Sequence, residues 1–205
     1  MKILRIALLS VLLFATLLSA GAQEMATIDK PAPLFTLPDS RGKTHSLSEF
    51  KGKYIVLEWV NFDCPFVRKH YRSGNMPALQ LAYREKGVVW LSICSSAPGK
   101  QGYFERKELT DRITQEHSAS TAYLIDKDGA VGKMYGAKAT PHMFVINPEG
   151  VLLYAGAIDD IASTKIDDLK RATNYVRECL DAALAGREVK VKTSNAYGCS
   201  VKYMD

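Results

Sequence analysis

An apolar run that stops just before a cysteine and a proline constrains this chain more than any other feature. Residues 54–60 are rich in β-branched and aromatic side chains, which is typical of a buried strand. Cys64 and Pro65 follow, and proline is favoured at the first position of a helix because its missing N–H would be unpaired there. The pattern therefore predicts a buried strand that passes into a helix at Cys64.

This predicted position favours a reactive thiol at Cys64. The positive end of the helix dipole and the unpaired backbone N–H groups at a helix start both stabilise a thiolate. A thiol with a pKa near 8.5 is only about 3% ionised at pH 7, whereas a pKa of roughly 6 leaves about nine in ten molecules ionised. The alternative is a small buried apolar side chain, the commonest role of free cysteine. The neighbouring Pro65 favours the reactive thiol.

The first 22 residues are predicted to be a secretory signal peptide. Lys2 and Arg5 are basic, residues 6–18 are almost wholly apolar, and residues 20–22 (Ala-Gly-Ala) match a cleavage site. We expect cleavage near Ala22 and a periplasmic or secreted chain without a stable membrane span after processing; an uncleaved anchor is the alternative. The rest, long enough for one α/β domain, is assigned to a domain over residues 23–186 and a tail over residues 187–205.

Charge and cysteine content narrow the function classes. The formal net charge is +5, and removal of Lys2 and Arg5 lowers it by two to +3. The basic residues are scattered, so no nucleic-acid partner is expected. Four cysteines are too few for a disulfide-stapled scaffold of this length, but in an oxidising compartment any two that meet can pair.

Strand and helix patterns alternate along the predicted domain. They predict a hairpin over 35–47, the strand before Cys64, a helix in two parts (65–71 and 76–86), a strand over 88–93 that ends at Cys94, a charged helix over 101–117, a strand over 121–125, a hairpin of strands 142–146 and 151–158, and a long helix over 166–185. This order predicts an α/β fold with one mixed central sheet between helices, an N-terminal hairpin, and a C-terminal helix plus tail. Cys64 and Cys94 then stand at the carboxyl ends of parallel strands, where such sheets bind ligands.

Three segments resemble one superfamily. Residues 61–67 (Asn-Phe-Asp-Cys-Pro-Phe-Val) resemble the active-site junction of thioredoxins and peroxiredoxins, and residues 139–145 (Ala-Thr-Pro-His-Met-Phe-Val) resemble their cis-proline loop. Residues 32–39 (Ala-Pro-Leu-Phe-Thr-Leu-Pro-Asp) are similar to the start of alkyl hydroperoxide reductase/thiol-specific antioxidant domains, and the ending Gly-Cys-Ser-Val-Lys-Tyr is similar to an uncharacterised peroxiredoxin-like branch. The resemblance spans residues 31–158 and implies a thioredoxin-like fold, a redox-active Cys64 and no cofactor or metal.

The departures from these families limit what can be carried over. Val67 stands where thioredoxins have a second cysteine, so a disulfide within the helix is impossible. Asn61 and Leu57 stand where ordinary peroxiredoxins have a threonine and a proline. The resemblance thus implies a redox thiol more strongly than it implies a peroxide-binding geometry.

Residues near Cys64 supply the candidate site. Arg68 lies on the same predicted helix face and could stabilise a thiolate, or it is a solvated cation; Asn61 can donate a hydrogen bond. By resemblance, Thr140 and a cis Pro141 shape the substrate groove. His142 is a candidate ligand or acid–base group or simply a residue at a strand start. His70 should face away from Cys64, since six residues turn a helix by about 240°.

The other three cysteines receive separate interpretations. Cys179 shares a helical stripe with apolar residues and is expected in the core. Cys94 is a possible partner of Cys64 or a buried wall. Cys199 lies on a tail that we expect to be mobile, where local unfolding costs little, so it is the preferred resolving thiol; a structural bridge is its alternative.

The sequence therefore predicts an exported thiol oxidoreductase that reduces hydroperoxides through Cys64. Cys64 would become a sulfenic acid, Asn61 and Arg68 would stabilise developing charge, Cys199 would form the disulfide, and an external thioredoxin-like reductant would reset it. The alternatives are a thiol–disulfide exchange protein that acts on exported protein disulfides, a copper-binding or redox-sensing module built on Cys64 and His142, and a structural protein stapled by Cys64–Cys199.

Overall fold

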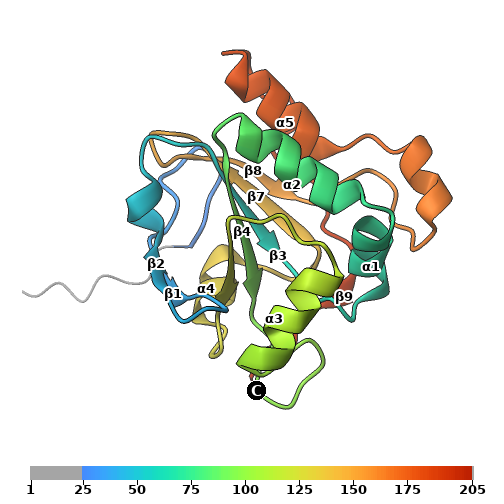
Figure 1. Ribbon diagram of the computed structural model, residues 1–205. Coiled ribbons are helices and arrows are strands. Elements are labelled where there is room, and N and C mark those ends of the chain that lie inside the picture. Colours follow the sequence, from blue (N-terminus) through green and yellow to red (C-terminus); the bar gives the residue numbers. More distant parts are fainter. Residues whose placement is uncertain (1–24, 205) are drawn as a thin grey trace, which may run out of the picture.

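A five-stranded mixed sheet forms the centre of the computed structural model, which describes residues 25–204 (Figure 1). Its strand order is β5-β4-β3-β7-β8. β3 pairs in parallel with β4 and β4 with β5, whereas β7 runs antiparallel to both β3 and β8. The strands are β3 (Ile55–Trp59), β4 (Val89–Cys94), β5 (Ala122–Ile125), β7 (His142–Ile146) and β8 (Leu152–Gly156). The predicted mixed sheet flanked by helices is confirmed.

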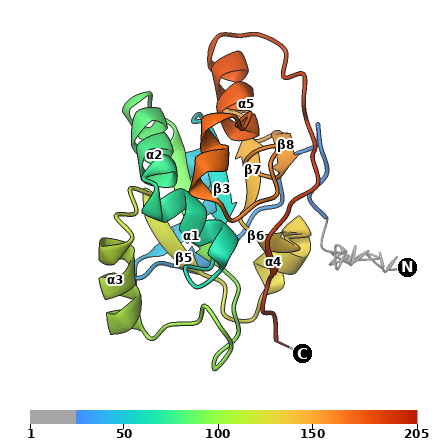
Figure 2. The same cartoon turned by 90° about the vertical axis from the view of Figure 1, so that its right-hand side faces the viewer.

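Each face of the sheet buries its own apolar cluster. Because successive strand residues point to opposite faces, Val56 and Leu57 of β3 belong to different clusters. The Val56 face is covered by α1 (Pro65–Arg72), α2 (Asn75–Glu85) and α5 (Tyr175–Leu184), which Figure 2 shows on one side of the sheet. The Leu57 face is covered by α4 (Ala130–Tyr135) and the segment that holds the N-terminal hairpin.

The predicted N-terminal hairpin is present. β1 (Thr36–Pro38) pairs antiparallel with β2 (Thr44–Ser46), and a 3-10 turn, η1 (Leu47–Phe50), follows. The carboxylate of Asp39 accepts hydrogen bonds from the backbone N–H groups of Arg41 and Lys43. An aspartate that bonds the backbone ahead of it is a typical turn former, which explains why the chain reverses there.

Two helices differ from the prediction. The charged helix predicted over 101–117 is α3 (Arg106–Gln115), because Gly102 has a φ of +88° and packs against the Asn61 side chain, which keeps its segment out of a helix. The short α4 was not predicted. Its first turn is fixed from outside: the Asp126 carboxylate accepts hydrogen bonds from the N–H groups of Val131 and Gly132.

The long helix predicted over 166–185 is also divided. A 3-10 turn, η2 (Ile166–Lys170), precedes α5, and Asn174 caps the start of α5 by accepting a hydrogen bond from the N–H of Arg177. The backbone N–H of Thr173 donates to the Asp160 carboxylate instead of a helical carbonyl. These side-chain acceptors bind backbone N–H groups and so divide the helix, although the apolar periodicity of the sequence favours one continuous helix.

The C-terminal segment is bound along the domain, which differs from the mobile tail that we expected. Figure 2 shows it descending from α5 past β6 (Ala139–Thr140) and α4. β9 (Cys199–Ser200) pairs antiparallel with β6. Further backbone hydrogen bonds join Lys192 and Ser194 to Ala155. The Tyr203 hydroxyl donates to the carbonyl of Ala137, so the segment is fixed on both sides of Cys199.

The predicted signal peptide, residues 1–22, lies outside the described residues. Within residues 25–204, every helix is too short or too polar to span a lipid bilayer.

Candidate redox site

Cys64 is the N-cap residue of α1, and Pro65 is the first residue of that helix, as predicted. A tight turn after β3 sets this position: the Cys64 N–H donates to the Asn61 carbonyl at 3.0 Å, and the Asp63 N–H donates to the Asn61 side-chain oxygen at 2.9 Å. Cys64 has no exposed surface, at 0%. The thiol therefore lies at the start of a helix but is shielded from solvent by other parts of the chain.

Cys199 lies directly against this thiol. The antiparallel pairing of β6 with β9 places Cys199 opposite Thr140, the residue before Pro141. The backbone N–H of Cys199 donates to Cys64 Sγ at 3.4 Å, and the Cys64 thiol donates to the Thr140 carbonyl at 3.1 Å. Residues far apart in the sequence thus form one site from α1, β6 and β9.

Gly198 makes this close approach possible. Its φ of +133° is a conformation that residues with a side chain rarely adopt. A Cβ atom at this position would lie 2.0 Å from the Thr140 carbonyl oxygen, well inside any allowed contact. Only glycine therefore lets β9 reach β6 at Cys199.

The two thiols differ in acidity. Burial opposes ionisation of Cys64, but hydrogen bonds from the Cys199 thiol and from the backbone N–H groups of Val67 and Cys199 outweigh it and lower the pKa of Cys64. Burial, the hydrogen bond to Cys64 and the charge of Cys64 raise the pKa of Cys199 to about 11. The pair therefore consists of a buried thiol with a lowered pKa under a partly exposed thiol with a raised pKa.

Arg68 and Asn61 do not act as a direct clamp on the sulfur in this structure. The Arg68 guanidinium donates to the Phe62 carbonyl at 3.2 Å and lies 3.4 Å from the Asp63 carboxylate. The Asn61 amide donates to the Gln101 carbonyl at 3.3 Å, in addition to accepting from Asp63. Both residues shape the turn that precedes the thiol, which is a positioning contact and not the charge-stabilising contact that we expected.

The loop at Pro141 lies beside the thiol, and the Thr140–Pro141 peptide is cis, as the resemblance implies. His142 is buried, and its described contacts are with Lys138 and Phe144 and not with the thiol. Its Nδ1 accepts from the Lys138 N–H at 3.3 Å and its ring lies 4.5 Å from that of Phe144. Burial and the charge of Lys138 lower its pKa to about 4. Within residues 25–204 no three His, Cys, Asp or Glu side chains gather as a metal site, so the copper alternative gains no support from geometry.

The remaining cysteines are separate from the pair. Cys94 ends β4, is buried and donates to the Gly102 carbonyl at 3.4 Å, and burial raises its pKa. Cys179 is buried in the core, where desolvation raises its pKa to about 12, in line with the packing role that its helical stripe predicts. The structure thus brings Cys199, not Cys94, to Cys64.

Sequence reasoning missed two groups of buried titratable side chains. Glu58 of β3 is fully buried and accepts four hydrogen bonds, from the side chains of Tyr71, Gln80, Trp90 and Ser92. A glutamate inside the apolar run 54–60 was the available signal. Burial raises its pKa despite these donors.

The second group contains Lys69 and His70 of α1, and no pattern in the sequence marks its partners, which come from the segments after β8 and α5. The described contacts of His70 are with Asn75 and Asp159 and not with Cys64, in line with the prediction that it faces away from the thiol.

Comparison with known proteins agrees with this architecture. Residues 28–155 match the family model described as AhpC/TSA family. Thiol-disulfide oxidoreductase ResA of Bacillus thuringiensis is 28% identical over 131 residues, which cover 64% of this chain and 70% of the relative. An uncharacterized conserved protein from Geobacillus kaustophilus superposes with a TM-score of 0.75 at 25% identity, covering 88% of this chain and 94% of that one.

The thioredoxin domain of a thiol-disulfide oxidoreductase from Bacteroides vulgatus shares the fold, with a TM-score of 0.52 at 19% identity over 71% of this chain and 96% of that one. The family match covers most of the chain and includes both the Cys64 junction and the Pro141 loop. The protein has a thioredoxin-like fold and belongs to the AhpC/TSA family.

Proposed function

We propose that this protein is a thiol–disulfide oxidoreductase in which Cys64 and Cys199 form the redox couple. The observation that carries the proposal is the hydrogen bond from the Cys199 N–H to Cys64 Sγ, which holds the two cysteines together while both are reduced. The thiol–disulfide oxidoreductases among its relatives support this exchange chemistry over hydroperoxide reduction. Export, predicted from residues 1–22, is part of the proposal and makes exported protein disulfides the expected substrates.

In the first half-reaction the Cys64 thiolate attacks one sulfur of a substrate disulfide. A bond forms between Cys64 Sγ and that sulfur, and the other substrate sulfur leaves as a thiolate and takes a proton from water. Cys64 is now uncharged in a mixed disulfide. Because the charge and hydrogen bond of Cys64 contribute to the raised pKa of Cys199, Cys199 becomes easier to ionise at this stage.

The Cys199 thiolate then attacks Cys64 Sγ and expels the second substrate sulfur. The result is a Cys64–Cys199 disulfide and a substrate dithiol, so two electrons and two protons pass from the protein to the substrate. An external dithiol of the thioredoxin type completes the cycle. Its thiolate reaches the partly exposed Cys199 more easily than the buried Cys64, and Cys64 leaves as the stabilised thiolate.

Access to Cys64 requires the C-terminal segment to move, because Cys64 has 0% exposed surface while Cys199 lies against it. The β6–β9 ladder that holds the segment is only two residues long in each strand. Short ladders of this kind open at little cost. We therefore expect substrates to bind while residues around Cys199 are lifted from β6.

A disulfide-exchange experiment tests the proposal. One equivalent of oxidised glutathione added to the reduced protein should produce a Cys64–Cys199 disulfide, found by peptide mapping, and reducing activity toward a protein disulfide should disappear in Cys64→Ser. Cys179→Ser is the matched control, since that buried thiol has a raised pKa and should not matter. A Cys64–Cys94 bridge, or activity that survives in Cys64→Ser, would contradict the proposal.

The same samples separate exchange from the two competing interpretations. If hydrogen peroxide consumes Cys64 much faster than oxidised glutathione does at equal concentration, the peroxidase interpretation replaces exchange. If the Cys64–Cys199 disulfide forms but resists reduction by excess dithiol, the pair is a structural staple.

A further inference from the structure

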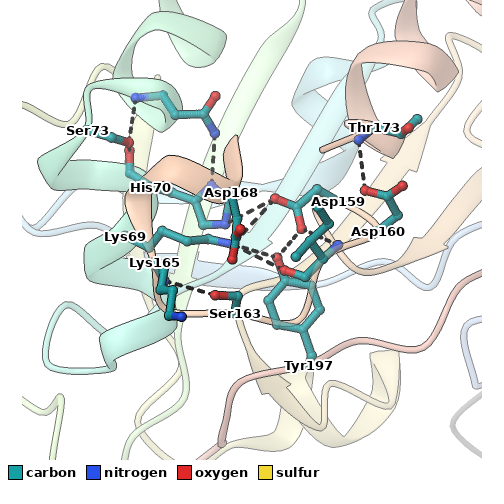
Figure 3. Close-up of polar contacts among 12 residues, drawn as sticks. Lys69, His70, Ser73, Asp159, Asp160, Ser163, Lys165, Asp168, Thr173 and Tyr197 are labelled. Carbon is teal, nitrogen blue, oxygen red and sulfur yellow. Dashed lines mark hydrogen bonds and ion pairs between the residues drawn. The ribbon is translucent and has the colours of Figure 1, made fainter. Parts of the chain in front are cut away.

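A buried polar cluster beside the redox site joins the active-site helix to the C-terminal segment (Figure 3). We call it the Asp159 cluster; it contains Lys69 and His70 of α1, Asp159 from the loop after β8, and Tyr197 from the C-terminal segment. Figure 3 shows the side chains of the other three residues converging on the carboxylate of Asp159. Tyr197 lies only two residues before Cys199, so the cluster binds the C-terminal segment next to the redox couple.

Tyr197 is held by several contacts at once. Its hydroxyl donates a hydrogen bond to the Asp159 carboxylate and accepts one from Lys69 Nζ at 3.4 Å. Lys69 Nζ lies 5.4 Å from the centre of the Tyr197 ring, and the ring of Phe66 lies 5.7 Å from it. Phe66 and Lys69 both belong to α1, which begins immediately after Cys64.

The charged groups of this cluster are shielded from water, so only protein groups can solvate them. The side chain of Lys69 is 0% exposed and that of Asp159 is 2% exposed, and their charged atoms lie 3.6 Å apart. Asp159 Oδ1 accepts from the Tyr197 hydroxyl and from the Ile161 N–H, while Oδ2 faces Lys69 and His70 without a hydrogen bond. Buried charges need all the partners that they can reach, so the tyrosine hydroxyl is required where it stands.

Fixing Tyr197 also restricts Cys199. Two residues of extended chain span at most about 7 Å, and Gly198 alone separates these side chains. Cys199 itself is held by the two-residue ladder with β6, by a hydrogen bond from the Thr140 hydroxyl to its carbonyl and by its N–H bond to Cys64 Sγ, and the segment that follows is bound in turn. Side chains anchor the segment before Cys199 at Ser194, which bonds the Tyr154 hydroxyl and the Ala157 N–H, and at the Asp159 cluster, which is the anchor nearer to Cys199.

We propose that Tyr197 is a positioning residue that, held by Asp159 and Lys69, keeps Cys199 against Cys64 and so sets how fast the couple opens to substrate and closes to a disulfide. This inference rests on the proposed exchange function. It predicts opposite effects on the two steps. Loosening the anchor exposes Cys64 and speeds its attack on a disulfide, but lowers the local concentration of Cys199 and slows closure.

The test compares Tyr197→Phe with Tyr83→Phe in the full chain. Tyr83 is a matched control, because its hydroxyl also donates to a carboxylate, that of Asp181 at 2.8 Å, but it joins α2 to α5. Reduced protein is mixed with dithiobis-nitrobenzoate, and the release of the coloured thiolate is followed by stopped flow. The first release reports attack by Cys64, and the second reports closure by Cys199.

For Tyr197→Phe we expect a faster first release and a second release slower by about tenfold, which corresponds to the loss of a hydrogen bond to a charged group. Tyr83→Phe should change neither rate even if it lowers the melting temperature equally. An unchanged second release in Tyr197→Phe, or an equal change in both variants, would overturn the proposal. Should Tyr197→Phe fail to fold, Phe66→Leu replaces it, since it keeps every charge of the cluster and removes the ring that packs against Tyr197, and the same pattern is expected at smaller size.

A second measurement separates this inference from the proposed function. If wild-type protein shows no second release, the exchange function fails, and hydrogen exchange of the reduced protein then decides on the anchor. Val201 lies two residues after Cys199, and its N–H donates to the Lys138 carbonyl. This N–H should exchange faster than in wild type in Tyr197→Phe but not in Tyr83→Phe. Equal exchange rates in the two variants would overturn the anchor.

Discussion

Replacing Gly198 by alanine should uncouple Cys199 from Cys64 without unfolding the protein. The new Cβ would lie 2.0 Å from the Thr140 carbonyl oxygen, whereas carbon–oxygen contacts are normally no closer than about 3.3 Å. The C-terminal segment must therefore retreat by about 1.3 Å or more. That movement breaks the ladder at Thr140 and Cys199 and the hydrogen bond from the Cys199 N–H to Cys64 Sγ.

The expected magnitude follows from the bonds that are lost. Two hydrogen bonds place Cys199 on β6, the ladder bond at Thr140 and the bond from the Thr140 hydroxyl to the Cys199 carbonyl. At about 1 kcal/mol each, their loss corresponds to a roughly thirtyfold lower effective concentration of Cys199 at Cys64 and a roughly thirtyfold weaker disulfide at equilibrium. The backbone strain of alanine at positive φ adds roughly 1–3 kcal/mol, which a control must reproduce. Gly87→Ala is that control, because Gly87 has a φ of +84° and a Cβ there would meet nothing within 4 Å.

A redox titration against glutathione measures the disulfide in wild type and in both variants, and thermal unfolding measures stability. Gly198→Ala and Gly87→Ala should both be less stable than wild type, but only Gly198→Ala should weaken the disulfide, by about thirtyfold. If Gly198→Ala keeps the wild-type equilibrium constant, the close approach of β9 to β6 does not determine the couple, and the reasoning is wrong.

Three further predictions concern Cys64, Arg68 and the N-terminus. Because folding lowers the pKa of Cys64, its thiolate contributes stability that is present above the ordinary thiol pKa of about 8.5 and is lost as the pH falls through the folded pKa. In denaturant titrations, the stability of reduced wild type relative to Cys64→Ala should therefore increase with rising pH. Parallel stability curves for the two proteins would contradict this. Arg68→Ala should change the rate of thiol–disulfide exchange by no more than about fivefold, since the guanidinium contacts Phe62 and Asp63. A larger loss would indicate that Arg68 stabilises the Cys64 thiolate directly. Mass spectrometry of protein from its native host should find an N-terminus near Gln23, and intact Met1 in the membrane fraction would favour an anchor.

Local patterns predicted most of the elements but placed some of their ends wrongly. Apolar strand runs and the proline at position 65 identify β3 and α1 because burial and proline geometry act within a few residues. The helix expected from residue 101 begins at Arg106, since Gly102 packs under Asn61, which is distant in sequence. The division of the last helix at Asn174 depends likewise on contacts that periodicity does not contain.

The candidate site shows the same limit. Its resemblance to thioredoxins and peroxiredoxins implied a redox-active Cys64 and a cis Pro141. Cys199 was predicted to be the partner of Cys64 because we expected it to lie on a mobile tail. The structure brings Cys199 to Cys64 for a different reason, because β9 pairs with β6 and Tyr197 is bound by Asp159. Arg68, which helix spacing places beside the thiol, is drawn instead to the Phe62 carbonyl and Asp63.

By itself the sequence determined which residues are buried in strands, where α1 begins, and that a thiol stands at its start, because hydrophobic alternation and helix-end chemistry depend on near neighbours. Only the tertiary structure decided which cysteine meets Cys64, what lowers the pKa of Cys64, and which buried charges hold the C-terminal segment. Those properties depend on contacts such as Cys64 with Cys199 and Lys69 with Asp159, whose partners are separated by 90 or more residues of chain. The free energy of a buried charge or thiolate is set by the donors that folding places around it, and no local pattern encodes their identity.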